Sequence, residues 1–188
     1  RQLLPEVASR FYKSKPTNII AVTGTNGKTS IANFYYQILT LNNKRAAAIG
    51  TLGVLSKTFN LKTNNTTIDP INIHKILNKL KVLKIDNVIL EASSHGLKQH
   101  RLNGINFNTA LFTNLSRDHL DYHKTFKDYL NSKLILFNKL LNNKGNIIFD
   151  DKISQAKQLN NISKKIKLKK YNFGTDKSFI NILNIQKI

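Results

Sequence analysis

The chain has 188 residues, a length that suits one domain with a substantial hydrophobic core. Cysteine is absent from the sequence, which excludes disulfides and thiolate metal sites and fits a cytoplasmic protein. The formal net charge of +20 would suit an anionic partner, but the lysines are scattered along the chain, so we expect no nucleic-acid ligand. No stretch is long and apolar enough to span a membrane, and we expect a monomer.

Apolar runs alternate with helical patterns, which predicts an α/β fold with a mostly parallel sheet and flanking helices. The expected strands are Asn18–Thr23, Arg45–Ile49, Asn87–Glu91, Thr109–Thr113, Asn146–Phe149 and Lys169–Phe173. The expected helices are Lys28–Leu41, Pro70–Leu83, Phe126–Leu141 and Ile153–Lys164. The segment Thr51–Asn65 reads as a loop, and Phe179–Ile188 alternates apolar and polar residues like the start of a strand.

The stretch AVTGTNGKTS, residues 21–30, lies between the first expected strand and the first long helix. It ends as the common phosphate loop does, with Gly27, Lys28 and Thr29, although Val22 stands where that loop has its first glycine. Backbone N–H groups of a glycine-rich turn at a helix N-terminus point at an anion, and the helix dipole favours it. Lys28 can reach the outer phosphates and the Thr29 hydroxyl can ligate magnesium, so the stretch predicts a phosphate-binding loop.

The variant G-T-N-G-K-T, preceded by an apolar strand, resembles the loop of the Mur ligase superfamily, which also includes folylpolyglutamate synthases. The resemblance implies an amide-forming ligase that uses ATP and magnesium. The ATP-binding residues that it implies are Gly24, Thr25, Asn26, Gly27, Lys28, Thr29 and Ser30.

An acidic residue, Glu91, ends the next buried strand, at the sheet edge where open α/β sheets bind their ligands. It could hold the magnesium of ATP, or it could face water as an ordinary strand-end glutamate. The following stretch, EASSHGLKQHR, is similar to the E-V-S-S-H-G-L motif of the Mur ligases that add the third peptide residue, with Ala92 replacing valine. That resemblance implies that Ser93, Gln99 and Arg101 contact a UDP-muramoyl substrate. A nucleophilic pair of Ser94 with His95 is the rival interpretation, and it lacks the G-x-S-x-G turn.

The tripeptide Asn65-Thr66-Thr67 is uninformative by itself, because such polar triplets are common in loops. It stands just before Asp69-Pro70, a good helix opening with a capping aspartate and a proline at the first position. By the same resemblance, Asn65, Thr66 and Thr67 belong to the muramoyl-substrate site.

The stretch FTNLSRDHLDYH, residues 112–123, is the most specific segment of the chain. His119 follows an apolar strand, where a neutral imidazole can ligate a metal ion or simply be hydrogen-bonded within a loop. The string matches the Mur ligase signature closely, and this match implies that His119 is a magnesium ligand together with Thr29 and Glu91.

Lys133 lies in the apolar stripe of the helix expected from Phe126 onward, where a hydrophobic residue is the rule. A lysine there either extends its amine to solvent from the edge of the stripe or is buried. A buried, deprotonated amine can react with carbon dioxide to form a carbamate, whose oxygens can ligate a metal ion. The resembled family carries such an N6-carboxylysine at the corresponding place. This implies that Lys133 is a metal ligand and that it is a catalytic residue together with Lys28 and His119.

Taken together, the motifs resemble those of the central ATP-binding domain of tripeptide-forming Mur ligases. This resemblance implies a ligase that joins an amino acid, diaminopimelate or lysine, to the UDP-muramoyl dipeptide through an acyl phosphate, in peptidoglycan synthesis. We expect residues 1–17 to end a preceding N-terminal domain and linker, and residues 18–188 to form the central domain, truncated before a C-terminal domain. The segment alone should therefore be inactive.

Two other functions are open on sequence grounds. Another ligase of the superfamily, such as a folylpolyglutamate synthase, would share the phosphate loop but not the S-S-H-G-L stretch with Gln99 and Arg101. A phosphate-loop ATPase acting on nucleic acid would explain the loop and the charge, but not the stretch 112–123.

Overall fold

The computed structural model describes residues 3–180. It contains a seven-stranded sheet in the order β3-β2-β4-β1-β5-β6-β7, in which β3 is antiparallel to β2 and all other neighbours are parallel. The strands are β1 Asn18–Thr23, β2 Ala46–Gly50, β3 Gly53–Ser56, β4 Asn87–Glu91, β5 Phe107–Phe112, β6 Leu141–Asp150 and β7 Lys169–Phe173. This architecture confirms the predicted mostly parallel α/β fold.

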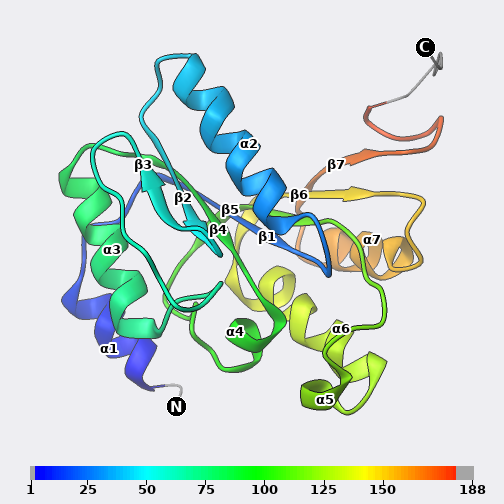
Figure 1. The fold of residues 1–188 in the computed structure, drawn as a ribbon. Coiled ribbons are helices and arrows are strands. Elements are labelled where there is room, and N and C mark those ends of the chain that lie inside the picture. The colour runs from blue at the N-terminus through cyan, green and yellow to red at the C-terminus, as the bar shows by residue number, and fades with distance from the viewer. Residues whose placement is uncertain (1–2, 181–188) are drawn as a thin grey trace.

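The helices are α1 Leu3–Phe11, α2 Lys28–Leu41, α3 Pro70–Val82, α4 Ser94–Lys98, α5 Leu120–His123, α6 Phe126–Ile135 and α7 Ala156–Lys165, with a π-helical turn η1 over Leu136–Leu140. Helix α2 packs on β2, β4 and β1 on one side of the sheet, whereas α3, α4, α6 and α7 lie on the other side (Figure 1). Right-handed crossovers require this division, because the chain moves in one direction along the sheet through α2 and returns in the other. Helix α1 packs on α3.

The hydrophobic core lies mainly between the sheet and the larger layer of helices, and it includes the fully buried Leu77, Leu80, Phe107 and Phe137. A smaller cluster, formed by Val22, Ala32, Ala48 and Ile89, lies under α2. The side chains of β1 alternate between these two clusters, so both faces of the central strand are covered with apolar groups. The strand that leads into the phosphate loop is therefore packed from both sides.

The opening of α3 follows the sequence prediction. The carboxylate of Asp69 accepts hydrogen bonds from the backbone N–H groups of Ile71, at 3.1 Å, and Asn72, at 3.0 Å, and Pro70 occupies the first turn. The predicted last residue, Leu83, is the C-cap instead of a helical residue.

The prediction that Thr51–Asn65 is a loop is wrong in its first half. The chain turns after β2, and Val54 and Leu55 pair with Ile49 and Ala48 as the antiparallel strand β3. Leu61 then returns to form an isolated bridge with Val54. The strand β3 consists of the short apolar piece Gly-Val-Leu-Ser, and its pairing with β2 makes this piece a strand.

The predicted helix Phe126–Leu141 is shorter than expected. Helix α6 ends at Ile135 and continues as the π-helical turn η1, after which β6 starts at Leu141 instead of Asn146. The wider turn re-aims the apolar side chains that follow, so that Leu136, Phe137 and Leu140 are all buried.

Other expected segments differ from the structure at their ends or in kind. The structure assigns Ala46–Gly50, Phe107–Phe112 and Ala156–Lys165 where Arg45–Ile49, Thr109–Thr113 and Ile153–Lys164 were predicted, and it contains the short helices α4 and α5 where loops were expected. Of the expected strand Phe179–Ile188, Ile180 forms a parallel bridge with Phe173, and residues 181–188 lie outside the described residues. Within residues 3–180, no helix is both long and apolar enough to cross a membrane.

Candidate active site

The phosphate loop joins β1 to α2 through two glycines with positive φ, Gly24 at 151° and Gly27 at 85°. A Cβ on Gly24 would lie 1.8 Å from the Thr113 hydroxyl oxygen, so only glycine fits at this position. Gly27 is the N-cap of α2, and its left-handed backbone directs the start of the helix across the end of β1. The loop therefore has the strand–turn–helix context that an anion-binding helix N-terminus requires.

Residues that follow β5 hold this loop in place. The backbone N–H of Thr25 donates to the carbonyl of Asn114 at 3.0 Å, and that of Asn26 donates to the Asn114 side chain at 2.9 Å. The Thr113 hydroxyl donates to the Asn26 carbonyl at 2.7 Å. The loop is thus shaped by hydrogen bonds to a segment some ninety positions away in sequence as well as by its own glycines.

Two lysine amines meet at the loop. Lys28 donates to the carbonyl oxygens of Gly24 at 2.9 Å and Thr25 at 2.8 Å, and Lys133 of α6 donates to the same Gly24 oxygen at 2.8 Å. Burial lowers the pKa of Lys28, while Glu91 acts in the opposite direction. Two amine donors therefore converge on one carbonyl oxygen of the loop, beside the N-terminus of α2.

Lys133 is buried, with only 1% of its surface exposed, so the prediction that it lies inside the apolar stripe is confirmed and the solvent-directed alternative is wrong. Its amine lies 4.3 Å from the centre of the Tyr129 ring. Burial, together with the smaller effect of the Lys28 charge, lowers the pKa of Lys133 to about 7, while Asp118 acts in the opposite direction. A substantial share of this amine is therefore neutral and nucleophilic at neutral pH.

The Glu91 carboxylate is buried at the end of β4 and faces the loop, so the water-facing alternative is wrong. Its Oε2 accepts hydrogen bonds from the hydroxyls of Thr29 at 2.8 Å and Thr51 at 3.2 Å, and its Oε1 accepts the backbone N–H of Thr51 at 2.9 Å. A Cβ on Gly50 would lie 2.1 Å from Oε1, so the carboxylate lies directly over this glycine. Thr29 and Glu91 together present hard oxygen ligands of the type that magnesium prefers.

The predicted muramoyl-binding residues are brought together by the backbone after β4. The Thr67 hydroxyl lies 2.9 Å from the Glu91 carbonyl oxygen and 2.9 Å from the Ser93 hydroxyl, which caps α4 by accepting the Gly96 N–H. The Arg101 guanidinium donates to the Thr67 carbonyl at 2.7 Å and to the Gln99 side-chain oxygen at 2.6 Å. This cluster connects directly to Glu91.

The other predicted residues of the two binding sites lie at the surface around this cluster. The Thr66 hydroxyl is 3.0 Å from that of Thr51 and so joins the Glu91 contacts, whereas Asn65 is exposed and contacts Thr63 through its carbonyl oxygen. Ser30 is exposed in the first turn of α2.

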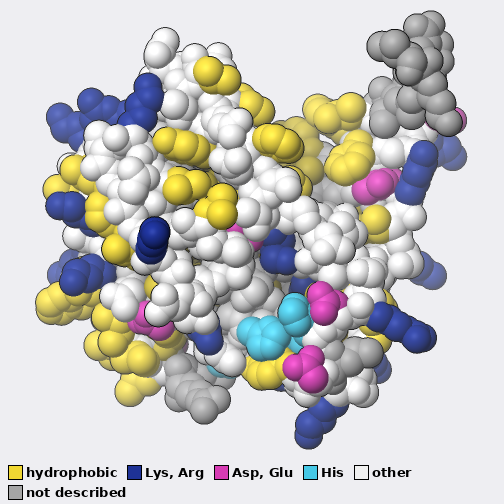
Figure 2. Space-filling view, in the orientation of Figure 1, with side chains coloured by type: hydrophobic (Ala, Val, Ile, Leu, Met, Phe, Trp, Pro, Cys, Tyr) yellow, Lys and Arg dark blue, Asp and Glu magenta, His cyan; other side chains and the backbone are white. Residues whose placement is uncertain are grey.

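His119 sits in a left-handed turn, φ 52°, with 47% of its side chain exposed. Its ring packs edge-on against those of His95, at 5.0 Å between centroids, and Tyr129, at 6.0 Å. Histidine and acidic side chains gather on this face of the molecule (Figure 2). Within residues 3–180, no three His, Asp or Glu side chains form a cluster suited to a metal ion, so carboxylates and imidazoles alone do not complete a cation site at Glu91.

Several residues that shape the site were not predicted from the sequence. Gly50 and Thr51 follow one predicted strand, and Thr113 ends another that Asn114 follows, so the rule that ligands bind at the carboxyl ends of parallel strands could have found them. Tyr129, whose hydroxyl lies 3.1 Å from that of Thr25, is buried on α6 one turn before Lys133 and carried no local signal.

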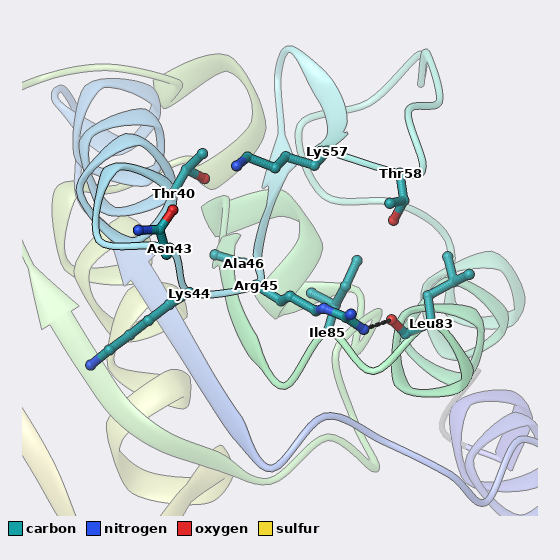
Figure 3. A pocket seen from close by; sticks show the side chains of 9 residues that line it. All are labelled: Thr40, Asn43, Lys44, Arg45, Ala46, Lys57, Thr58, Leu83 and Ile85. Carbon is teal, nitrogen blue, oxygen red and sulfur yellow. Dashed lines mark hydrogen bonds between the residues drawn. The ribbon is translucent and has the colours of Figure 1, made fainter.

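A separate cavity of about 450 Å³ lies at the opposite edge of the sheet, where α2 ends and β2 begins (Figure 3). Thr40, Asn43, Lys44, Arg45, Ala46, Lys57, Thr58, Leu83 and Ile85 line it. The Arg45 guanidinium points to the Leu83 carbonyl at 3.4 Å, and none of the predicted site residues takes part. The site at the carboxyl ends of β1, β4 and β5 is therefore the better candidate.

Comparison with known families decides the assignment. Residues 22–187 match the family described as Mur ligase middle domain. This chain belongs to the Mur ligase family. The phosphate loop, Glu91 and the substrate segment of this Mur ligase domain all lie inside the matched residues, as the sequence resemblance implied.

Several curated relatives of this Mur ligase domain are named UDP-N-acetylmuramoyl-L-alanyl-D-glutamate–2,6-diaminopimelate ligase. The protein of that name from Brucella melitensis biotype 1 is 46% identical over 141 residues, which cover 75% of this chain and 29% of the relative. The one from Rickettsia bellii is 42% identical over 175 residues, covering 90% of this chain and 36% of the relative. The Mur ligase domain thus spans about a third of the length of these relatives.

Solved structures agree with the fold. A structure described as UDP-N-acetylmuramoyl-L-alanyl-D-glutamate–2,6-diaminopimelate ligase is 30% identical and has a TM-score of 0.82, covering 96% of this chain and 37% of that one. A bifunctional folylpolyglutamate synthase/dihydrofolate synthase from Yersinia pestis, complexed with AMPPNP and a manganese ion, has a TM-score of 0.67. It is 18% identical and covers 90% of this chain and 46% of that one, so it shows a shared fold alone.

Proposed function

We propose that the full-length protein to which this Mur ligase domain belongs is an ATP-dependent ligase of peptidoglycan synthesis. It joins an amino acid to UDP-N-acetylmuramoyl-L-alanyl-D-glutamate, and the names of the relatives favour 2,6-diaminopimelate as that amino acid. The observation that carries the proposal is the direct connection between the two halves of the site. Thr29 of the phosphate loop bonds to the Glu91 side chain, while Thr67 of the substrate segment bonds to the Glu91 backbone.

The proposed reaction has two steps. A substrate carboxylate oxygen attacks the γ-phosphorus of ATP, forming an acyl phosphate and releasing ADP. The amino group of the incoming amino acid then attacks the acyl carbon, loses a proton and displaces inorganic phosphate. Lys28 and the amides at the start of α2 stabilise the negative charge on the transferring phosphoryl group, which is the largest contribution that a protein makes to this chemistry.

Magnesium fits the oxygens that Thr29 and Glu91 place 2.8 Å apart. When bound, the ion would neutralise charge on the phosphate oxygens of ATP. The residues that would hold it are Thr29 and Glu91, with His119 and a carbamylated Lys133 as the further ligands that the family resemblance implies.

The carbamate on Lys133 is part of this proposal. The neutral amine would attack the carbon of carbon dioxide, forming a C–N bond and releasing one proton. Burial supports the reaction, since it lowers the pKa of Lys133 to about 7. We expect Lys133→Ala to abolish ligation and acetate or formate to restore part of it, because a small carboxylate can supply the missing oxygens. An unmodified Lys133 amine in a nucleotide-bound structure would contradict the carbamate.

The substrate half of the site consists of Asn65, Thr66, Thr67, Ser93, Gln99 and Arg101. The Arg101 guanidinium is already oriented by Gln99 and the Thr67 carbonyl, so it can meet an anionic group of the UDP-muramoyl dipeptide with little loss of side-chain entropy.

The decisive experiment incubates the full-length enzyme with ATP, magnesium and the UDP-muramoyl dipeptide, and compares diaminopimelate with lysine. Phosphate release should depend on both the dipeptide and the amino acid, and mass spectrometry should show the UDP-muramoyl tripeptide. Turnover with a folate and glutamate instead would support the folylpolyglutamate synthase alternative. Stimulation of ATP hydrolysis by nucleic acid, with no effect of the dipeptide, would support the nucleic-acid ATPase.

A further inference from the structure

A buried histidine that the proposed chemistry does not use joins the two halves of the site. His123, the last residue of α5, is fully buried between α4 and α6. Its Nε2 lies 2.9 Å from the hydroxyl of Ser94 in α4, and its Nδ1 lies 3.3 Å from the hydroxyl of Ser132 in α6. The Asp128 carboxylate, also in α6, lies 3.7 Å from the same Nδ1.

His123 thus bridges Ser94 of α4 and Ser132 of α6. The positions of the protons in this bridge follow from the partners of Ser132. Its hydroxyl donates its single proton to the backbone carbonyl of Asp128 at 2.8 Å, so toward His123 it can only accept. The His123 Nδ1 must therefore carry the hydrogen and donate. In the neutral ring, Nε2 is then the acceptor, and it receives the hydroxyl proton of Ser94.

The two ends of this bridge belong to different parts of the site. Ser94 begins the helix that Ser93 caps and that leads into Gln99 and Arg101, the proposed muramoyl-binding residues. Ser132 directly precedes Lys133, whose amine bonds to the phosphate loop. A second link runs parallel to the first, because Lys98 of α4 donates to the Asp128 carboxylate.

We propose that His123 is a positioning residue that sets the distance between the substrate segment and the Lys133 side of the phosphate loop. The inference rests on the proposed function. Helix α4 has only five residues and carries substrate-binding groups on both sides, so its own backbone cannot fix it against α6. An imidazole with one donor and one acceptor at opposite edges is the side chain that spans two hydroxyls in this order.

Other roles for His123 conflict with the geometry. The Ser94–His123 pair resembles a nucleophile and its base, but Ser94 has 2% of its surface exposed and His123 none, so a substrate cannot reach them. A metal-ligand role would require a free ring nitrogen, and both nitrogens face hydroxyl groups. The histidine of the neighbouring motif that was considered for a nucleophilic pair, His95, stacks instead on Tyr122 at 4.0 Å between ring centroids.

The test uses the full-length enzyme and three variants, H123F, S94A and their combination. H123F keeps a ring but removes both hydrogen bonds, and we expect kcat/KM for the UDP-muramoyl dipeptide to fall by about 10- to 100-fold, as misplacement of reacting groups by about 1 Å does. KM for ATP should change by less than about threefold, because the phosphate loop is untouched. S94A should cost less than H123F, and the double variant should resemble H123F, since both changes remove the same hydrogen bond.

His74→Phe is the matched control, because His74 is also a fully buried histidine, located on α3 and bonded to the Asn103 carbonyl at 3.0 Å. It should lose stability without the selective loss of dipeptide kcat/KM. Hydrogen–deuterium exchange gives a readout independent of activity: H123F should accelerate exchange in both α4 and α6, and H74F should not. Normal dipeptide kinetics in folded H123F, or unchanged exchange in α4, would overturn the inference. If H123F fails to fold, S94A alone decides. An inactive wild-type enzyme would instead refute the proposed function, and the exchange experiment would still judge the bridge.

Discussion

Replacing Lys133 with methionine should stabilise the protein at neutral pH and should abolish its activity. The amine is buried and its pKa is lowered from 10.5 to about 7, chiefly by burial. Each unit of that difference corresponds to about 1.4 kcal/mol, so bringing the lysine into the folded state costs about 4 kcal/mol at pH 7. Methionine has nearly the same length and no charge. It loses the bond to the Gly24 carbonyl, worth about 1 kcal/mol, and the contact of the amine with the Tyr129 ring, worth about 1 kcal/mol when the amine is charged.

The sign of the pH dependence follows from proton counting. Between pH 7 and 10.5 the unfolded chain holds the Lys133 proton and the folded chain has lost it, so the stability of the wild type rises with pH. Above pH 10.5 the cost is gone, and below pH 7 it is constant. The advantage of K133M should therefore shrink by about 3 kcal/mol between pH 7 and pH 10.

Guanidinium unfolding of the 188-residue chain measures the difference in free energy of unfolding between K133M and the wild type. Unfolding is followed by far-ultraviolet circular dichroism, because the chain lacks tryptophan. Carbon-dioxide-free buffer ensures that only the amine titrates. Lys139→Met, at an exposed position of η1, is the control and should change the free energy of unfolding by less than about 0.5 kcal/mol at every pH. A K133M difference that does not vary with pH would refute the assignment of a lowered pKa to Lys133.

Three further predictions follow from the site. Lys28→Ala should abolish ATP turnover of the full-length enzyme. Its melting temperature should stay within a few degrees of the wild type, since the amine contacts loop carbonyls and not the core. Near-normal phosphate release would contradict the phosphate-loop interpretation. Gly50→Ala should displace the Glu91 carboxylate, because the new Cβ would lie 2.1 Å from Oε1. The magnesium concentration needed for half-maximal turnover should then rise by about tenfold, which corresponds to a loss of about 1.4 kcal/mol in magnesium binding. An unchanged magnesium titration would contradict Glu91 as a metal ligand. The 188-residue chain alone should bind ATP–magnesium weakly in calorimetry and form no amide, because ligation needs the second substrate held against the acyl phosphate; dipeptide-dependent turnover by this chain would show that it is sufficient.

Much of the fold was predictable because local pattern and tertiary structure agree. The strands Asn18–Thr23, Asn87–Glu91 and Lys169–Phe173 and the helix Lys28–Leu41 have the predicted bounds. Strand β3 was missed because its formation depends on pairing with β2, which no local pattern encodes. Helix α6 was predicted too long because apolar spacing continues through the π-helical turn η1.

The site was predictable where a residue follows a strand, and less so where it acts across the fold. The inward direction of Lys133 was visible as a charge within an apolar stripe. The bonds of Thr51 to Glu91 and of Asn114 to the loop join segments 40 and 88 positions apart, and the sequence alone gives no distance between such segments. His123 was hidden for the same reason, since its partners Ser94 and Ser132 lie on two different helices.

The long sequence separation of the contacts around the phosphate loop has a consequence for how the chain folds. Lys133 reaches the loop across 109 positions, and Tyr129 reaches Thr25 across 104. Closing such loops costs entropy that local contacts cannot offset, so parallel pairings of this kind form slowly. We expect the phosphate loop of a nascent chain to be synthesised long before it adopts its folded shape. The chain should gain affinity for nucleotide only after α6 has left the ribosome and packed against the loop. Nucleotide would then favour completed folding over partly folded forms, because it binds a feature that only the completed fold contains.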